Sequence, residues 1–204
     1  KLVSEGVLPE FLTFVNFAKL GMTDYGLFIN TKKLTKEKEN EFITYIQNNS
    51  NVSYFAKVGG KYDFIVGIIA KDILHFNDLL SEIMNKYGNN ISNRDIAIRL
   101  VLFHFPKDYL VDKERTGGSL PSFGGEIEIA DLDDLDKKIL KELAVNARAN
   151  LVEISEKLEI PASTIAIRLK KLQKEKIIEG FFTLIDSSKF GFENYNLMIS
   201  FSNV

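Results

Sequence analysis

The first half of the chain alternates between two hydrophobic periods, one of two residues and one of three to four. Segments with the strand period lie at 24–30, 52–58, 62–70 and 96–105, and segments with the helix period lie at 35–47 and 72–87. The run 62–70 is apolar on both faces, which is typical of a central strand. Asp72 then precedes a helical stripe that starts at Ile73 and ends at Tyr87. The order βαββαβ predicts a ferredoxin-like domain, with two helices on one face of an antiparallel sheet.

Three more helices are expected after residue 130. Acidic residues crowd the start of the first, near Asp131, and lysines follow, an order that suits the helix dipole. Asn150 with Glu153 is typical of a capping box at the start of the second, and Pro161 suits the first position of the third, 161–174. The expected inward-facing residues are Leu132, Leu135, Ile139, Leu140, Leu143, Leu151, Ile154, Leu158, Ile165, Leu169 and Leu172. Three short helices in this order predict a helix-turn-helix.

The segment 115–125, RTGGSLPSFGG, separates these two regions. Its four glycines and one proline favour an exposed linker. The alternative is an ordered crossover loop anchored by Phe123, and the composition alone leaves both open.

Positive charge is concentrated in the third helix. The whole chain has a formal net charge of −2, whereas 161–176 holds five basic residues and one acidic residue, a net of +4. Short polar residues at the start of such a helix can reach base edges in a major groove, and basic residues can contact phosphates. The DNA-binding candidates are Ser163, Thr164, Ile167, Arg168, Lys170, Lys171, Lys174 and, ahead of the second helix, Arg148. The alternative is a structural three-helix module with a solvated basic face.

A repeat links the two ends of the chain. Segment 1–29 matches segment 171–199 at a constant offset of 170, with ten of 29 positions identical and no gap. The identical pairs include Phe11 with Phe181 and Thr13 with Thr183. The offset is too long for a solenoid and favours two tandem copies of a unit of about 170 residues. The alternative is a chance similarity between two hairpins.

Residues 132–186 resemble the DNA-binding module of the Lrp/AsnC family of transcription regulators. The matching residues are Leu132, Asp133, Asp136, Ile139, Leu140, Leu143, Asn146, Ala147, Arg148, Glu153, Ile154, Ser163, Thr164, Ile165, Arg168, Leu169, Leu172, Glu175, Ile177 and Ile178. Residues 22–105 resemble the family's ligand-sensing RAM domain more loosely. That match rests on Val52, Val58, Gly60, Tyr62, Asp63 and the apolar strand that follows.

The resemblance implies an α+β chain: a ferredoxin-like sensor domain followed by an all-α winged helix-turn-helix domain. It also implies pairing of sensor domains into homo-oligomers, and a small effector, commonly an amino acid. The effector candidates are Gly59, Gly60, Lys61, Tyr62 and Asp63. The alternative for this turn is a plain hairpin tip, in which glycine supplies a positive φ.

Combined with the repeat, the resemblance divides the chain into five parts. The expected parts are the tail end of an upstream helix-turn-helix unit at 1–20, the RAM-like domain at 21–114, a linker at 115–126, the helix-turn-helix domain at 127–190 and the first strand of a second, truncated RAM-like domain at 191–204. Three residues depart from the family pattern. Glu159 stands where a turn glycine is common, Lys176 stands where glycine is usual, and Pro161 replaces a frequent serine cap.

The composition limits which side chains could bind a metal or a cofactor or take part in catalysis. With no cysteine and only His75 and His104, the sequence shows no metal-ligand cluster, cofactor motif or paired carboxylates beside a base, so we expect no metal, no cofactor and no enzyme. Both histidines are expected to be structural. The alternatives are a sensor or scaffold without DNA binding, or an enzyme of the haem-pathway decarboxylases that resemble this family. No run of about 18 apolar residues and no signal sequence are visible, so we expect a cytoplasmic protein.

Overall fold

The computed structural model describes residues 1–105, 110 and 120–199. Two compact units emerge from its backbone contacts. One contains Lys1–Phe14, Leu132–Lys171 and the chain from Gly180 onward, and the other contains Val15–Asp131 and Leu172–Glu179. Within the described part of the chain, no helix is long and apolar enough to cross a membrane.

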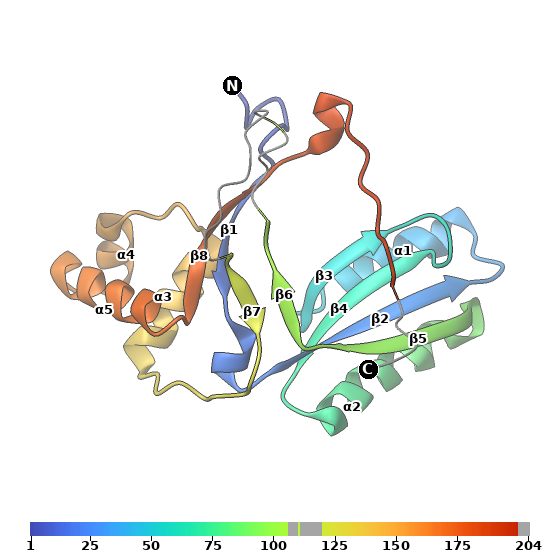
Figure 1. Ribbon diagram of the computed structural model, residues 1–204, viewed down its shortest axis with the longest axis horizontal. Helices are drawn as coiled ribbons and strands as arrows, with labels where there is room; N and C mark the ends of the chain where they lie inside the picture. Colours follow the sequence, from blue (N-terminus) through green and yellow to red (C-terminus); the bar gives the residue numbers. More distant parts are fainter. Residues whose placement is uncertain (106–109, 111–119, 200–204) are drawn as a thin grey trace. The chain divides into compact units, whose positions relative to one another are not determined.

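The second unit contains the expected βαββαβ domain (Figure 1). Its elements are β2 (Thr23–Thr31), α1 (Lys36–Gln47), β3 (Val52–Lys57), β4 (Phe64–Ala70), α2 (Ile73–Tyr87) and β5 (Ile91–Arg99). The strands form an antiparallel sheet in the order β3-β4-β2-β5, so β4 is central, as its continuous apolar run predicts.

One hydrophobic core joins the sheet to both helices. Leu27 of β2, Ile46 of α1 and Ile83 of α2 are each fully buried within it. The ring of Phe42 lies 5.2 Å from that of Phe64 and 5.1 Å from that of Tyr87, so aromatic contacts connect α1 to both β4 and α2. The two helices therefore cover the same face of the sheet.

Three details of this domain differ from the sequence-based expectation. Ile73 is 59% exposed because it lies in the first turn of α2, ahead of the buried stripe that begins at Phe76. The regular alternation expected over 52–58 is interrupted by a register shift between Val52 and Tyr54. The strand expected at 96–105 instead starts at Ile91 and ends at Arg99.

A separate two-stranded sheet follows β5. It pairs β6 (Val101–Phe103) with β7 (Ser122–Gly124), and Phe123 is only 8% exposed. Gly124 has φ +87°, and a Cβ there would lie 2.4 Å from the carbonyl oxygen of Leu100, so this turn requires glycine. The ordered-loop alternative therefore holds for 122–124, while 115–119 lie outside the described residues. Residues 126–130, between β7 and α3, form no strand.

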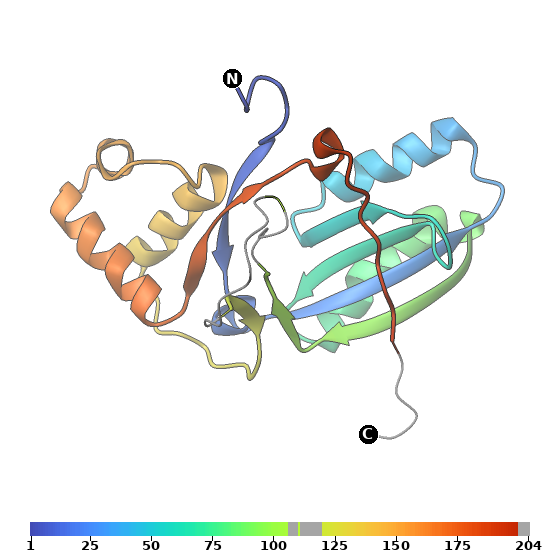
Figure 2. The same cartoon turned by 45° about the horizontal axis from the view of Figure 1, so that its top comes forward.

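The helix-turn-helix consists of α3 (Asp134–Val145), α4 (Leu151–Leu158) and α5 (Ala162–Lys174). Asp133 caps α3, and the capping box of Asn150 and Glu153 starts α4 as the sequence predicted. Pro161 lies one residue before α5, where its carbonyl accepts hydrogen bonds from the backbone N–H groups of residues 164 and 165. Figure 2 shows the three helices from a second side.

Two of the departures from the family pattern carry backbone strain. Glu159 has φ +55° and Lys176 has φ +59°, the left-handed region that glycine occupies at no steric cost. Each costs about 1 kcal/mol relative to glycine. The equivalent of Lys176 in the first repeat is Gly6, with φ +69°.

The two copies of the repeat form a ribbon in which β1 (Glu10–Val15) pairs with β8 (Ile178–Leu184). A short 3-10 helix follows each strand, capped by Asn16 and Gly21 in the first copy and by Asp186 and Gly191 in the second. The strand expected at 191–204 is absent from 192–199, where Leu197 is 84% exposed. The equivalent segment β2 is paired on both sides, whereas residues 192–199 pair with no strand in the described part of the chain. Residues 200–204 lie outside that part.

Candidate nucleic-acid interface

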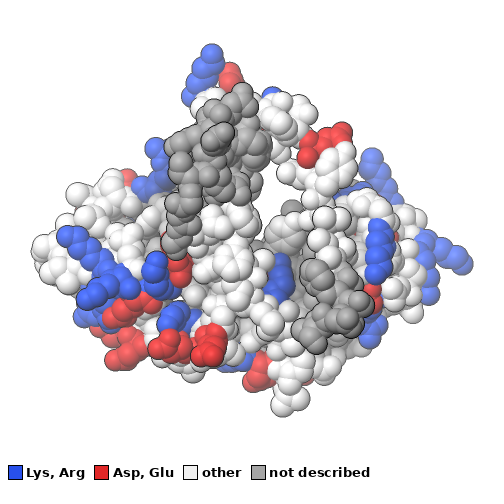
Figure 3. Space-filling model, in the orientation of Figure 1, with Lys and Arg blue, Asp and Glu red and all other residues white. Residues whose placement is uncertain are grey.

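One side of α5 is exposed along its whole length. Ser163, Ile167, Lys170 and Lys174 follow one another at steps of four, three and four residues, and all four are exposed. The aliphatic side chain of Ile167 is 68% exposed. We call these four residues the outer stripe. Figure 3 shows basic side chains over this part of the molecule, with acidic ones beside them.

The other two basic candidates of α5 point toward α3. The Arg168 Nη1 atom lies 2.6 Å from the Oδ2 of Asp133 and 3.4 Å from the Oδ1 of Asp136. The Lys171 Nζ atom lies 3.1 Å from the Oδ2 of Asp136. Arg168 and Lys171 thus form a cluster with the two aspartates at the start of α3, here called the acid-base clamp.

The clamp surrounds a fully buried carboxylate. Asp136 is 0% exposed, and such a charge is tolerated only beside cations. The backbone N–H of Asp136 and, to a smaller extent, Arg168 lower the pKa of Asp133. The clamp therefore fixes the rotation of α5 about its axis and directs the outer stripe away from α3.

Further contacts hold the helices that carry the stripe. Ile165 and Leu172 are fully buried on the inner side of α5. The Ser155 hydroxyl donates to the carbonyl oxygen of Ile160 at 2.6 Å, across the turn between α4 and α5. Lys157 and Glu142 form a 2.7 Å ion pair between α4 and α3. The outer stripe is thus carried by a packed three-helix body.

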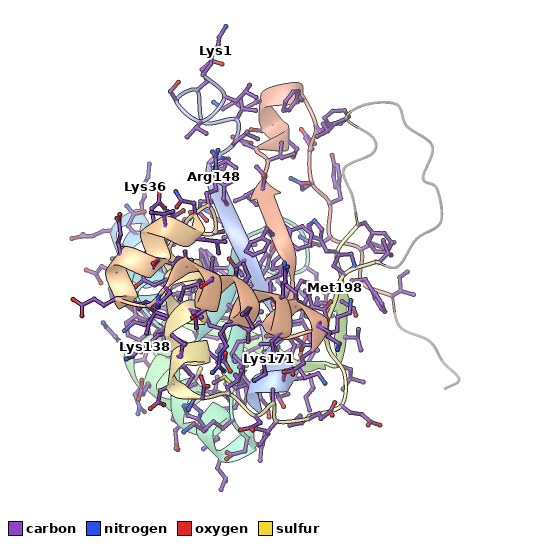
Figure 4. All side chains as sticks on the ribbon, turned by 90° about the vertical axis from the view of Figure 1, so that its left-hand side faces the viewer. Lys1, Lys36, Lys138, Arg148, Lys171 and Met198 are labelled. Carbon is purple, nitrogen blue, oxygen red and sulfur yellow. The ribbon has the colours of Figure 1, made fainter. Side chains whose placement is uncertain are left out.

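The remaining two candidates lie off the outer stripe. Thr164 is half-buried. The Arg148 guanidinium lies 4.6 Å from the centre of the Phe11 ring, a cation–π contact with β1, and Figure 4 shows Arg148 beside that strand. The structure therefore brings Ser163, Ile167, Lys170 and Lys174 together and places Arg148 elsewhere.

At the turn predicted to bind an effector, three side chains have structural partners. The Tyr62 side chain is buried, and its hydroxyl donates to Asp95 at 2.5 Å. The Asp63 carboxylate accepts from both the backbone N–H and the hydroxyl of Thr31, each at 2.7 Å. Gly59, Gly60 and Lys61 are exposed. Lys61 also has partners, since its ammonium lies 3.9 Å from the Asp95 carboxylate and 5.0 Å from the centre of the Tyr62 ring.

An open groove of about 860 Å³ lies elsewhere in the same domain, between α1 and α2. Polar side chains line most of it, including Asn40, Glu41 and Glu82. The Lys86 ammonium lies over the Tyr45 ring at 4.4 Å. The sequence analysis did not identify this groove.

The sequence analysis also missed a polar cluster on the sheet face opposite the helices. Asp24 is 2% exposed and bonds Arg99 Nη2 at 2.6 Å, and burial raises the pKa of Asp24 against the opposing effect of Arg99. A Cβ on Gly67 would lie 2.0 Å from Arg99 Nη2, so the arginine occupies the space above that glycine. A glycine inside a strand marks such a close approach, and Gly67 was the available signal.

The comparisons with known protein families agree with this arrangement. The model of the AsnC-type helix-turn-helix domain matches residues 132–173, and the model of the Lrp/AsnC ligand binding domain matches residues 27–92. The first match covers α3 to α5, and the second covers most of the βαββαβ domain. The molecule is thus a helix-turn-helix protein with a separate ligand-binding domain. It belongs to the Lrp/AsnC family.

Curated relatives resemble the chain over part of its length. An uncharacterized HTH-type transcriptional regulator of Pyrococcus abyssi is 48% identical over 50 residues, which are 24% of this chain and 33% of the relative. Another from the same organism is 36% identical over 63 residues, or 31% of this chain and 41% of the relative. The chain thus spans between a third and two fifths of the length of these regulators.

Solved structures of the siroheme decarboxylase NirDL share the fold. The siroheme decarboxylase NirDL aligns over 90% of this chain and 52% of its own, with a TM-score of 0.54 and 13% identity. An AsnC family transcriptional regulator from Agrobacterium tumefaciens aligns over 53% of this chain and 73% of its own, with a TM-score of 0.46 and 17% identity. At this identity the likeness to NirDL concerns the fold.

Proposed function

We propose that the protein is a sequence-specific DNA-binding transcription regulator whose binding or assembly responds to a small effector, an amino acid in our hypothesis. The observation that carries the proposal is the outer stripe of α5. A small polar residue and an aliphatic residue lie at its start and two lysines at its end, all exposed on a rigid helix. That arrangement suits a recognition helix in a major groove.

Within this proposal the residues have different tasks. Ser163 and Ile167, with Thr164 beside them, face the base edges, where a hydroxyl can hydrogen-bond and an aliphatic group can contact a thymine methyl. Lys170 and Lys174 contact phosphates. Arg168 and Lys171 act as positioning residues, because both are paired within the clamp.

The sensing part rests on the ligand-binding family match, which spans the turn from Gly59 to Asp63. We propose that Gly59, Gly60 and Lys61 contact the effector, while Tyr62 and Asp63 shape the turn. Sensor domains pair in this proposal, so that the working form is a cytoplasmic homo-oligomer on double-stranded DNA.

We do not propose a catalytic function, although NirDL shares the fold. Among the described residues, no group of three or more His, Asp or Glu side chains could hold a metal ion. His75 has a local structural role, since its Nδ1 atom accepts a 3.3 Å hydrogen bond from the backbone N–H of Lys71. A regulator requires no chemistry from these side chains.

Selection from a random duplex pool tests the proposed function. The chain should enrich one sequence motif over successive rounds and bind it about 1,000-fold or more tighter than unrelated duplex at physiological salt. A Ser163→Ala, Ile167→Ala variant should lose the preference but keep nonspecific affinity, because the lysines remain. Recovery of an unenriched pool by the parent chain would contradict sequence-specific binding.

A further inference from the structure

The groove between α1 and α2 has two tyrosine rings among its lining. Tyr87 of α2 is buried, and its hydroxyl donates to the backbone carbonyl oxygen of Glu41 at 3.3 Å. Tyr45 of α1 is half-buried, and the centre of its ring lies 5.4 Å from that of Tyr87. Contacts between the two helices thus hold both rings in place, and a ligand in the groove would meet an aromatic surface.

An ammonium group already lies over these rings. The Lys86 Nζ atom is 4.4 Å from the centre of the Tyr45 ring and 5.4 Å from that of the Tyr87 ring. Glu82 precedes Lys86 by four residues on α2, a spacing at which glutamate and lysine readily pair. In the described part of the chain the two form no ion pair, and the lysine lies over the tyrosines instead. The aromatic surface therefore attracts an ammonium even where a carboxylate is within reach.

Three carboxylates of the groove have no counter-ion. Glu37, Glu41 and Glu82 line it and are exposed, and none of them takes part in an ion pair among the residues that the structure describes. Together with Lys86 they give the groove a formal charge of −2. Burial raises the pKa of the Tyr45 hydroxyl, and the charge of Glu82 raises it further against the opposing effect of Lys86. The negative potential thus extends to the aromatic surface.

The polar residues of α1 give the groove length. Asn40, Thr44 and Asn48 line it at steps of four residues, which places them in one row along the helix over about 12 Å. The Thr44 hydroxyl donates to the Asn40 carbonyl oxygen at 2.8 Å, so its oxygen can still accept. Amide and hydroxyl oxygens in such a row can accept hydrogen bonds from several N–H groups of one extended ligand.

We propose that the α1–α2 groove is a binding site for an aliphatic polyamine. One ammonium group pairs with Glu41 and Glu82, the methylene chain lies against the Tyr45 ring, and a further ammonium group reaches Glu37. The site involves neither DNA nor the turn at Gly59, so it can be tested apart from the proposed function.

The chemistry of the groove disfavours two other ligand classes. An amino acid would need a cation for its carboxylate, and Lys86, the basic residue of the lining, lies over the tyrosines. A metal ion would need ligands that converge on one point, and nowhere in the described ranges do three His, Asp or Glu side chains do so. Separated carboxylates beside an aromatic surface suit a ligand with several separated ammonium groups.

Lys86 has a specific part in this proposal. Its ammonium occupies the position over Tyr45 that a ligand ammonium would take, so the ligand must displace it. Lys86 therefore competes with the ligand, and its removal should strengthen binding. A groove whose lysine served only to stabilise the two helices would not gain affinity in this way.

Titration calorimetry with spermidine tests the site. The 204-residue chain is titrated without DNA at low ionic strength, where exposed charges are least screened. Glu41→Gln with Glu82→Gln should lower the affinity about tenfold, because two exposed ion pairs are lost. Tyr45→Leu should lower it about threefold, and Lys86→Ala should raise it about threefold.

A matched control separates the groove from the total charge of the chain. Asp78 and Glu126 are exposed and do not line the groove, so Asp78→Asn with Glu126→Gln changes the net charge equally. This variant should bind spermidine as the parent chain does. Circular dichroism confirms that each variant is folded.

Three results would overturn the proposal. The first is the absence of spermidine binding at millimolar concentration. The second is an equal loss of affinity in the groove variant and in the matched control, since general charge attraction would then explain the binding. The third is displacement of spermidine by Mg²⁺ beyond the effect of sodium chloride at the same ionic strength.

Discussion

Replacing Lys170 and Lys174 together with glutamate lowers the affinity for duplex DNA by about 100-fold or more at physiological salt. Each lysine of the outer stripe is exposed, and no ion pair engages either one among the described residues. Reversing the charge at both positions removes two phosphate contacts and places two carboxylates against the backbone of the duplex. Fluorescence anisotropy with a labelled duplex measures the loss.

A matched pair on α3 controls for the change in net charge. Lys138 and Lys141 are exposed and three residues apart, so their replacement with glutamate changes the charge of the chain by the same amount. This variant should keep most of the affinity, because neither residue lies on the outer stripe. An equal loss in both variants would mean that overall charge, and not α5, governs binding.

The Asp136→Ala substitution lowers the free energy of unfolding by about 2–3 kcal/mol. The substitution leaves Arg168 and Lys171 facing each other without their shared buried carboxylate. Both cations are about one-third exposed, so water limits the penalty to less than that of a fully buried pair. Urea denaturation followed by circular dichroism measures the change.

Asp134 provides the comparison for this prediction. Its side chain is 93% exposed and pairs only with Lys137 at 3.8 Å among the ion pairs of the described residues. Asp134→Ala should change stability by no more than about 0.5 kcal/mol. If the two alanine variants were equally stable, the clamp would not hold α5, and its lysine and arginine would be available for DNA.

The periodicity of the sequence predicted the order of the elements. The stripe from Phe76 to Tyr87 and the doubly apolar run around Val66 depend on local spacing, so they were visible without coordinates. The capping box of Asn150 and Glu153 is local as well. Where the outcome depended on tertiary neighbours, as at the end of β5, the sequence prediction was wrong.

The prediction of the candidate site from the sequence was limited in the same way. Counting charge in α5 located a basic helix but did not separate Lys170 and Lys174 from Arg168 and Lys171. The partners of the latter pair, Asp133 and Asp136, lie more than 30 residues away in the chain. The aspartates were interpreted as helix-dipole charges at the start of α3, and nothing local indicated that Asp136 would be buried.

The salt dependence of duplex binding tests the central claim most directly. Each phosphate neutralised by the protein contributes about 0.9 to the slope of log affinity against log salt. Replacing Lys170 and Lys174 with alanine should reduce that slope by about 1.8, whereas replacing Arg168 and Lys171 should leave it unchanged once the variants are shown to be folded. An unchanged slope for the Lys170 and Lys174 variant would contradict the assignment of the outer stripe as the DNA-contacting surface.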